Sequence, residues 1–167
     1  KAKNSEFAVN FLKILFCYYI ARGDYRFAAE SLYRLGTQIS CLGEKKQNLL
    51  AAINTLLVAG TEDHFVISES GKVLRVSDLR NEYLLLEGQH AVGHDYSPME
   101  TFSALLRIKN WSLALKIGKA FSLDLTELVN LLAAECITEA NNWKTLQGVL
   151  SEIDTRYKLT AVKKLLD

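Results

Sequence analysis

Apolar residues recur every three or four positions along most of the chain, which is the period of a helix with one buried face. Short turns separate these stretches, so consecutive helices are expected to lie antiparallel. The pattern predicts helices over residues 5–22, 25–35, 44–58, 79–91, 98–108, 111–121, 125–140, 143–153 and 155–166. We therefore expect an all-α fold, an irregular α-solenoid of about eight or nine helices, in a single domain over residues 1–167.

Residues 60–76 break the helical pattern. Val66 and Ile67, and then Val73 and Leu74, are strand-forming residues on either side of a turn-prone Ser-Gly pair. A small β-hairpin or an extended insertion is expected here.

Capping residues mark several helix starts. The segment Ser97–Glu100 combines a serine cap, a proline at the first helical position and a glutamate that can reach back to the cap. Asp124 and Glu127 repeat this arrangement, and Ser77 is the expected cap of the helix over 79–91.

Three helices share one plan at their starts. Each opens on an aromatic residue, Tyr25, Trp111 or Trp143, directly after an Asp or Asn that is expected to cap it. The two tryptophans lie 32 positions apart, within the range of two-helix repeats. The repeat is degenerate, which is why the expected solenoid is irregular.

The composition is that of a soluble globular protein, with 49% apolar and 23% charged residues, and excludes an intrinsically disordered chain. A net charge of +1 argues against a dedicated nucleic-acid-binding protein. Cys17, Cys41 and Cys136 are odd in number and form no C-x-x-C pair, so we expect free thiols in a reducing compartment. Cys17 and Cys136 lie within apolar helical stretches and are expected to be buried there as small apolar residues. Asn10 and Lys13 interrupt the first apolar stretch, and no transmembrane segment is expected.

Motifs for catalysis are absent from the sequence, with no phosphate-binding loop and no nucleophile elbow. His90 and His94 have the spacing of two zinc ligands on one helix face. Gly93 lies between them, where the helix is expected to end, so solvated histidines are the favoured interpretation. We expect no catalytic residue, no cofactor and no metal; an enzyme using His90, His94 and Asp95 is the rival from another class.

Three segments, in this order and spacing, resemble a known family. They are residues 24–33, DYRFAAESLY; 49–57, LLAAINTLL; and 78–85, DLRNEYLL; the stretch 105–120 is compatible. Together they resemble the C-terminal helical region of the large short-arm nucleoporin of the Y-shaped coat complex, in the outer ring of the nuclear pore. The resemblance covers about residues 15–140.

This resemblance implies a C-terminal fragment of a longer chain, in which a β-propeller precedes a helical stack without catalytic residues. It implies docking to other helical scaffold nucleoporins at the hub of the Y complex, at the nuclear envelope, in support of mRNA and protein transport. No small-molecule substrate and no direct nucleic-acid binding are expected. The alternative is a helical-repeat adaptor of a vesicle coat or of a peptide-binding type.

The expected partner surface lies on the last helices, because the terminal helix of a solenoid has no further repeat to cover its apolar face. The candidate interface residues are Leu146, Val149, Leu150, Ile153, Tyr157, Leu159, Val162, Leu165 and Leu166. The other interpretation is that these residues pack against the preceding helices.

Overall fold

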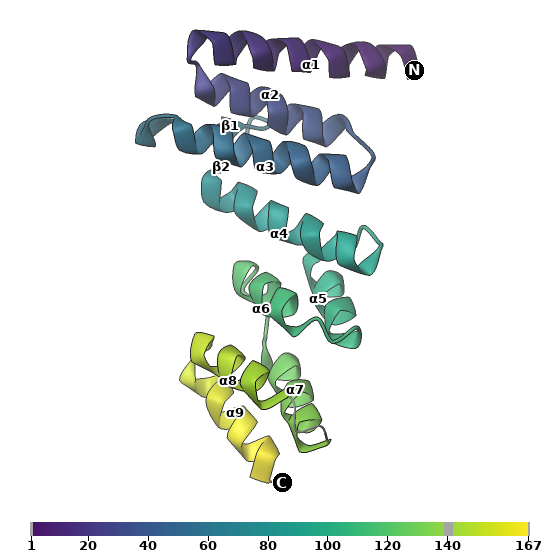
Figure 1. Cartoon of the computed structure of the whole chain (residues 1–167), viewed down its shortest axis with the longest axis vertical. Helices are drawn as coiled ribbons and strands as arrows, with labels where there is room; N and C mark the ends of the chain where they lie inside the picture. Colours follow the sequence, from purple (N-terminus) through teal and green to yellow (C-terminus); the bar gives the residue numbers. More distant parts are fainter. Residues whose placement is uncertain (1, 139–141, 167) are drawn as a thin grey trace. The chain divides into compact units, whose positions relative to one another are not determined.

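Helices make up most of the computed structural model, which describes residues 2–138 and 142–166, without the side chains of residues 2–6 (Figure 1). The helices are α1 (Ala2–Arg22), α2 (Tyr25–Gln38), α3 (Leu42–Val58), α4 (Val76–Val92), α5 (Pro98–Arg107), α6 (Trp111–Ala120), α7 (Thr126–Thr138), α8 (Trp143–Glu152) and α9 (Thr155–Leu166). A 3₁₀ turn (Thr61–Asp63) leads into the strands β1 (Phe65–Ile67) and β2 (Val73–Arg75). The predicted all-α fold is confirmed.

The small hairpin predicted within residues 60–76 is also confirmed. The strands β1 and β2 pair antiparallel, with Val66 opposite Leu74. Both of these side chains are buried, while their neighbours along each strand are less so. The hairpin therefore turns one apolar face toward the helices, as the alternation of its residues requires.

The described chain forms two compact units, Lys1–Glu87 and Gly88–Asp167, and the division falls inside α4. Each unit has its own apolar cluster. The expected single domain over residues 1–167 stays a prediction, and each unit is described by itself below.

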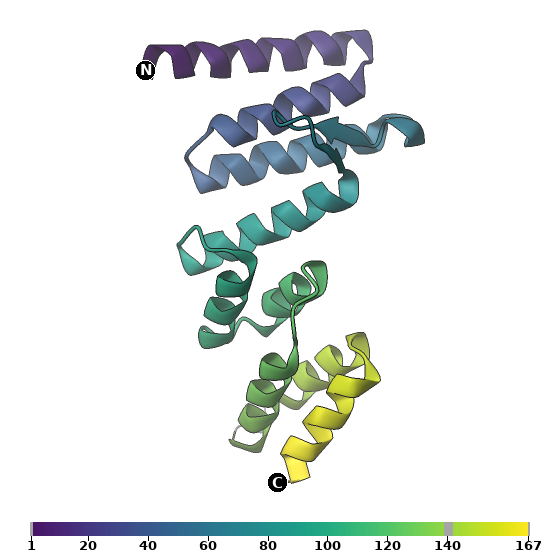
Figure 2. The ribbon, with the colours of Figure 1, turned by 180° about the vertical axis from the view of Figure 1, so that it is seen from behind.

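In the first unit, α2 lies between α1 and α3 (Figures 1 and 2). Ala28 and Ala29 are fully buried, and Leu32 and Leu35 lie on the same buried face, as their spacing predicts. Small residues at this position let the neighbouring helix backbones approach closely, and the leucines fill the space beside them.

Helix α3 buries only part of the inward face that the apolar period over residues 44–58 predicts, which consists of Leu49, Leu50, Ile53, Leu56 and Leu57. Leu49, Ile53 and Leu56 are buried, whereas Leu50 and Leu57 are 41% and 47% exposed. The prediction that Leu50 and Leu57 face inward is wrong. They lie one position beyond the buried stripe, where the 100° step of the helix turns a side chain off the core face.

Glu30 of α2 forms a hydrogen bond to the hairpin. Its carboxylate pairs with Arg34 at 2.7 Å and Arg26 at 3.4 Å, and accepts a hydrogen bond from the backbone N–H of Ile67 in β1. The Arg26 guanidinium also lies 5.0 Å from the ring centre of Phe65. The partly buried carboxylate of Glu30 thus gives a strand N–H its hydrogen-bond partner.

In the second unit, α7 contributes several fully buried side chains to the core. Leu128, Val129 and Leu132 are fully buried in the apolar cluster that also includes Phe102 of α5. Helices α8 and α9 follow α7 and pack against it. The core of this unit therefore centres on α7.

The predicted helix caps have mixed outcomes. Ser97 and Glu100 form the full capping box, and Asn110 accepts a hydrogen bond from the Leu113 N–H, as expected. Asp24 and Asn142 make no side-chain cap bond, so the prediction is wrong there; Asp24 pairs with Arg22 instead.

The last two predicted caps differ from expectation in position. Helix α4 follows β2 directly and begins at Val76, so Ser77 lies inside it and is not its cap. The carboxylate of Asp78 accepts a hydrogen bond from the N–H of Arg75 at this start. Asp124 accepts a hydrogen bond from the N–H of Thr126, as a cap would. The second bond of the predicted capping box, from the Asp124 N–H to the Glu127 carboxylate, is not among the hydrogen bonds of the described residues.

Candidate protein-interaction surfaces

The nine predicted interface residues fall into three groups. Leu146, Val149 and Ile153 are buried in the core of the second unit. Leu150, Tyr157 and Leu165 are half-buried and pack against that core. Leu159, Val162 and Leu166 are exposed by 66%, 50% and 82%. Only the last three present an apolar surface to solvent.

These three residues form what we call the α9 ridge. Their spacing of three and four positions places Leu159, Val162 and Leu166 on one side of α9. Ala161 is fully buried on the opposite side, where α9 packs against α7. The helix therefore has two apolar faces, of which the described chain covers one.

The flanks of the α9 ridge are basic. Between residues 155 and 166 the sequence has Arg156, Lys158, Lys163 and Lys164 and no acidic residue. Lys163 and Lys164 lie in the last turn, where the helix dipole favours cations. The ridge thus combines an apolar line with positive charge, a combination that suits an acidic amphipathic partner.

A second apolar ridge runs along α1. We call Phe7, Phe11, Ile14 and Tyr18 the α1 ridge; each is at least half exposed, and their 4-3-4 spacing places them on one side. On the other side, Leu12 is buried in the cluster of the first unit.

The interface prediction from the sequence missed the α1 ridge. A signal for it is present in the sequence, because the apolar residues between Phe7 and Ile20 occupy more of the helix circumference than a single buried face requires. Cys17, expected to be a buried thiol, is exposed on this helix, and Cys41 is exposed as well. Cys136 is buried as expected, and its burial raises the pKa of the thiol.

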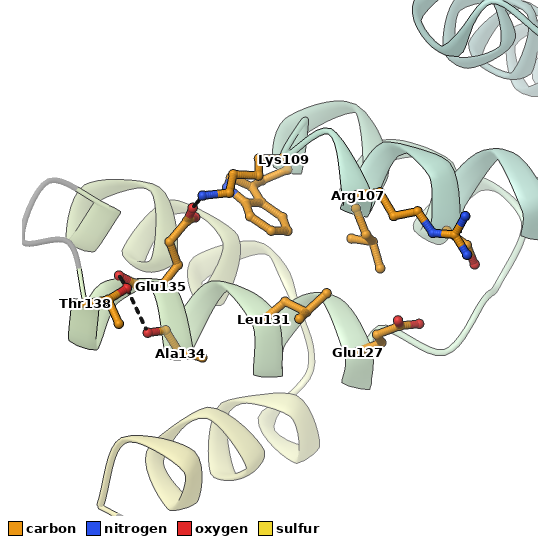
Figure 3. Close-up of a pocket in the computed structure, with 10 residues that line it drawn as sticks. Arg107, Lys109, Glu127, Leu131, Ala134, Glu135 and Thr138 are labelled. Carbon is orange, nitrogen blue, oxygen red and sulfur yellow. Dashed lines mark hydrogen bonds and ion pairs between the residues drawn. The ribbon is translucent and has the colours of Figure 1, made fainter.

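A groove opens beside α7 in the second unit. It has a volume of about 540 Å³ and lies between α7 and the segment that joins α5 to α6 (Figure 3). Leu106, Trp111, Leu131 and Ala134 are its apolar lining residues. We call it the α5–α7 groove.

The histidine pair does not form a metal centre. Helix α4 ends at Val92, Gly93 takes a positive φ of 76°, and His94 lies beyond the helix on the ring of Tyr96. His90 and His94 therefore do not share a helix face. Within the described part of the chain, no three His, Cys, Asp or Glu side chains are grouped to hold a metal ion.

A partly buried polar cluster of Tyr33, Lys45 and Glu82 lies between α2, α3 and α4. Burial, together with the nearby carboxylate of Glu82, raises the pKa of Tyr33 to about 12. Burial also raises the pKa of Glu82, while the charge of Lys45 and a hydrogen bond with Tyr33 act against that rise. The space beside this cluster is only about 10 Å³, so the three groups stabilise helix packing and leave no room for a ligand.

Comparison with known proteins finds neither a matching family model nor a matching curated protein. None of the helices in the described part of the chain is long and apolar enough to cross a membrane.

Proposed function

We propose that this chain is a structural scaffold that assembles with other helical proteins of the nuclear pore coat through the α9 ridge. The observation that carries the proposal is the second apolar face of α9, lined by Leu159, Val162 and Leu166. Two of these three side chains are more than half exposed and the third is half exposed, on a helix whose other face is already packed. Large apolar side chains grouped on one surface are typical of protein–protein contacts.

The nuclear pore assignment rests on the sequence resemblance described above. The segments that carry it fall on described helices: residues 24–33 precede and open α2, 49–57 form the second half of α3, and 78–85 lie in α4. A helical stack suits a role in which the chain holds partners in place. The mechanism is then the presentation of a helix face of fixed geometry, with a standard interface burying about 800 Å² per partner.

The basic residues beside the α9 ridge favour a partner surface that carries acidic residues. A partner helix with leucines or isoleucines on one face and Asp or Glu beside them would cover the ridge and face the lysines of α9. The apolar contacts would supply most of the affinity, and the charges would act on the association rate and on its dependence on salt.

A pull-down from a nuclear-envelope extract, read by mass spectrometry, tests the proposal. The bait is the 167-residue chain, and a second bait carries Leu159→Asp with Val162→Asp. The matched control carries Ser112→Asp with Gln147→Asp, the same change in charge at exposed positions of α6 and α8. We expect the wild-type and control baits to retain outer-ring nucleoporins and the ridge variant to lose them, with helical circular dichroism unchanged in all three.

Two outcomes would reject the proposal. Recovery of vesicle-coat subunits in place of outer-ring nucleoporins would keep the scaffold class and move the chain to the alternative coat. Recovery of the same nucleoporins by the ridge variant would show that α9 is not the docking surface.

A further inference from the structure

The α5–α7 groove has one acidic and one basic wall. Glu127 and Glu135 line it from α7, and Arg107 and Lys109 line it from the opposite side (Figure 3). The two glutamates are eight positions apart in the sequence, which corresponds to about 12 Å along a helix, or roughly two turns. Among the described residues, neither Arg107 nor Glu127 has an ion-pair partner.

The floor between these walls is apolar. Leu131 lies midway between the two glutamates on α7 and is 42% exposed, while Trp111 and Leu106 are buried behind it. Leu131 therefore gives the groove an apolar surface that water reaches. A groove of about 540 Å³ is within the range of ligand-binding clefts.

Glu135 is unusual in this groove. Its side chain is only 9% exposed, and one carboxylate oxygen pairs with the Lys109 ammonium. The other oxygen, Oε2, is buried and has no hydrogen-bond partner among the described residues. A buried, charged oxygen without a donor destabilises the folded state, so a donor brought by a ligand would bind favourably there.

Lys109 pairs with this carboxylate, and a donor of the ligand can replace it. The side chain of Lys109 is 59% exposed, so its ammonium already borders on water and another cation can take its place beside Glu135. The exchange leaves Glu135 paired before and after binding. It also gives the carboxylate a partner held inside the groove, where water competes less.

We propose that the α5–α7 groove binds an amphipathic helix of a protein partner, with a leucine or phenylalanine anchor on Leu131 and a lysine or arginine one turn away on Glu135. Carboxylates on the opposite flank of this helix face Arg107. The acidic and basic walls fix the direction in which the helix lies, because the reversed charge pattern places like charges together. The affinity comes mainly from the apolar anchor.

This site is separate from the α9 ridge. None of the residues that line the groove belongs to α9, so the two surfaces share no residue. The inference uses only residues of the second unit and does not depend on the nuclear pore assignment.

The test is binding of a designed probe to the 167-residue chain. The probe is a blocked alanine-based peptide of about 15 residues, long enough to form a helix. It carries leucines on one face, lysines on one flank and glutamates on the other. The readout is the NMR signal of the Trp111 indole in the groove, with the Trp143 indole on α8 as the internal reference.

We expect the Trp111 signal to shift saturably and the Trp143 signal to stay in place. Leu131→Glu and Glu127→Lys should each weaken binding about tenfold or more. Glu135→Gln should remove the preference for the lysine peptide over one with norleucine in its place. Leu159→Glu, on the α9 ridge, is the matched control and should bind as the wild type does.

Three results would overturn the proposal. The first is no shift of the Trp111 signal at millimolar peptide, and the second is equal binding by the wild type and Leu131→Glu. The third is self-association, measured by ultracentrifugation, that Leu131→Glu abolishes, because the occupant would then be a second copy of this chain.

Discussion

Gly88 marks the closest approach of α4 to its neighbours in the second unit. A Cβ at this position would lie 2.4 Å from Cδ1 of Ile117 and 2.7 Å from Cγ2 of Thr101. Carbon atoms in contact are normally about 3.5–4.0 Å apart. Both neighbours are fully buried, and the Thr101 hydroxyl donates a hydrogen bond to the Tyr96 carbonyl. Neither side chain can move away without disturbing the core.

We therefore expect Gly88→Ala to destabilise the second unit. Overpacking of a core by one methyl group costs about 1–3 kcal/mol. Alanine gains back at most about 1 kcal/mol over glycine in a helix interior. The net expectation is a loss of about 1–2 kcal/mol in the free energy of unfolding.

Gly148 provides a matched control on α8. A Cβ there would meet no atom within 4 Å, so only the helix propensity changes. Gly148→Ala should stabilise the same unit by about 0.5–1 kcal/mol. The same substitution is thus expected to lower the free energy of unfolding at Gly88 and to raise it at Gly148, because only Gly88 is in close tertiary contact.

Urea unfolding followed by tryptophan fluorescence measures both variants. The two tryptophans of the chain, Trp111 and Trp143, both belong to the second unit, so the signal reports the unit that carries the changes. With a typical slope, Gly88→Ala should lower the urea midpoint by about 1 M. A Gly88→Ala chain as stable as the wild type would refute the close packing at this residue, and destabilisation by Gly148→Ala would refute the account of the control.

Further predictions concern the first unit and the thiols. Glu30→Ala should expose the Ile67 amide to hydrogen exchange and destabilise the unit by about 1–3 kcal/mol, because two arginines and a strand N–H lose their partner; unchanged exchange at that amide would contradict this role. Tyr33 should remain protonated well above pH 10, because burial raises its pKa to about 12. The protonated Tyr33 hydroxyl contributes fully to the free energy of unfolding below its ordinary pKa of 10, and this contribution is lost as the pH rises through about 12. Tyr33→Phe should therefore make the free energy of unfolding less dependent on pH between 10 and 12; an unchanged pH dependence would contradict this role of Tyr33. A thiol reagent should label the two exposed cysteines quickly and Cys136 only on unfolding; equal labelling rates would disagree with the described burial.

Apolar periodicity and turn residues in the sequence predicted the helices and the hairpin. The three- and four-residue period placed all the helices of the described chain, and the strand-forming pairs around Ser-Gly predicted the hairpin. The Ser97–Glu100 capping box is complete because its bonds lie within one helical turn. Such features depend on residues close together in the chain, so one sequence is enough to predict them.

The residues predicted as an interface on the last helices are not all exposed. Periodicity identified the apolar positions from Leu146 to Leu166, and α8 and α9 do form there. It does not say which apolar face meets another helix. Packing against α7 buries Leu146 and Val149, and only the α9 ridge is left at the surface.

What the sequence determined by itself is the all-helical class, the positions of the turns and the small hairpin, because period and turn chemistry are local. The packing of the helices decides which side of α1 stays exposed, how closely α4 approaches its neighbours at Gly88 and which charges face each other across the α5–α7 groove. Glu127 and Lys109 are 18 positions apart in the chain and line one groove only because α7 folds back beside the α5–α6 segment. Exposure and proximity are properties of the packed helices, and residues distant in sequence set them together.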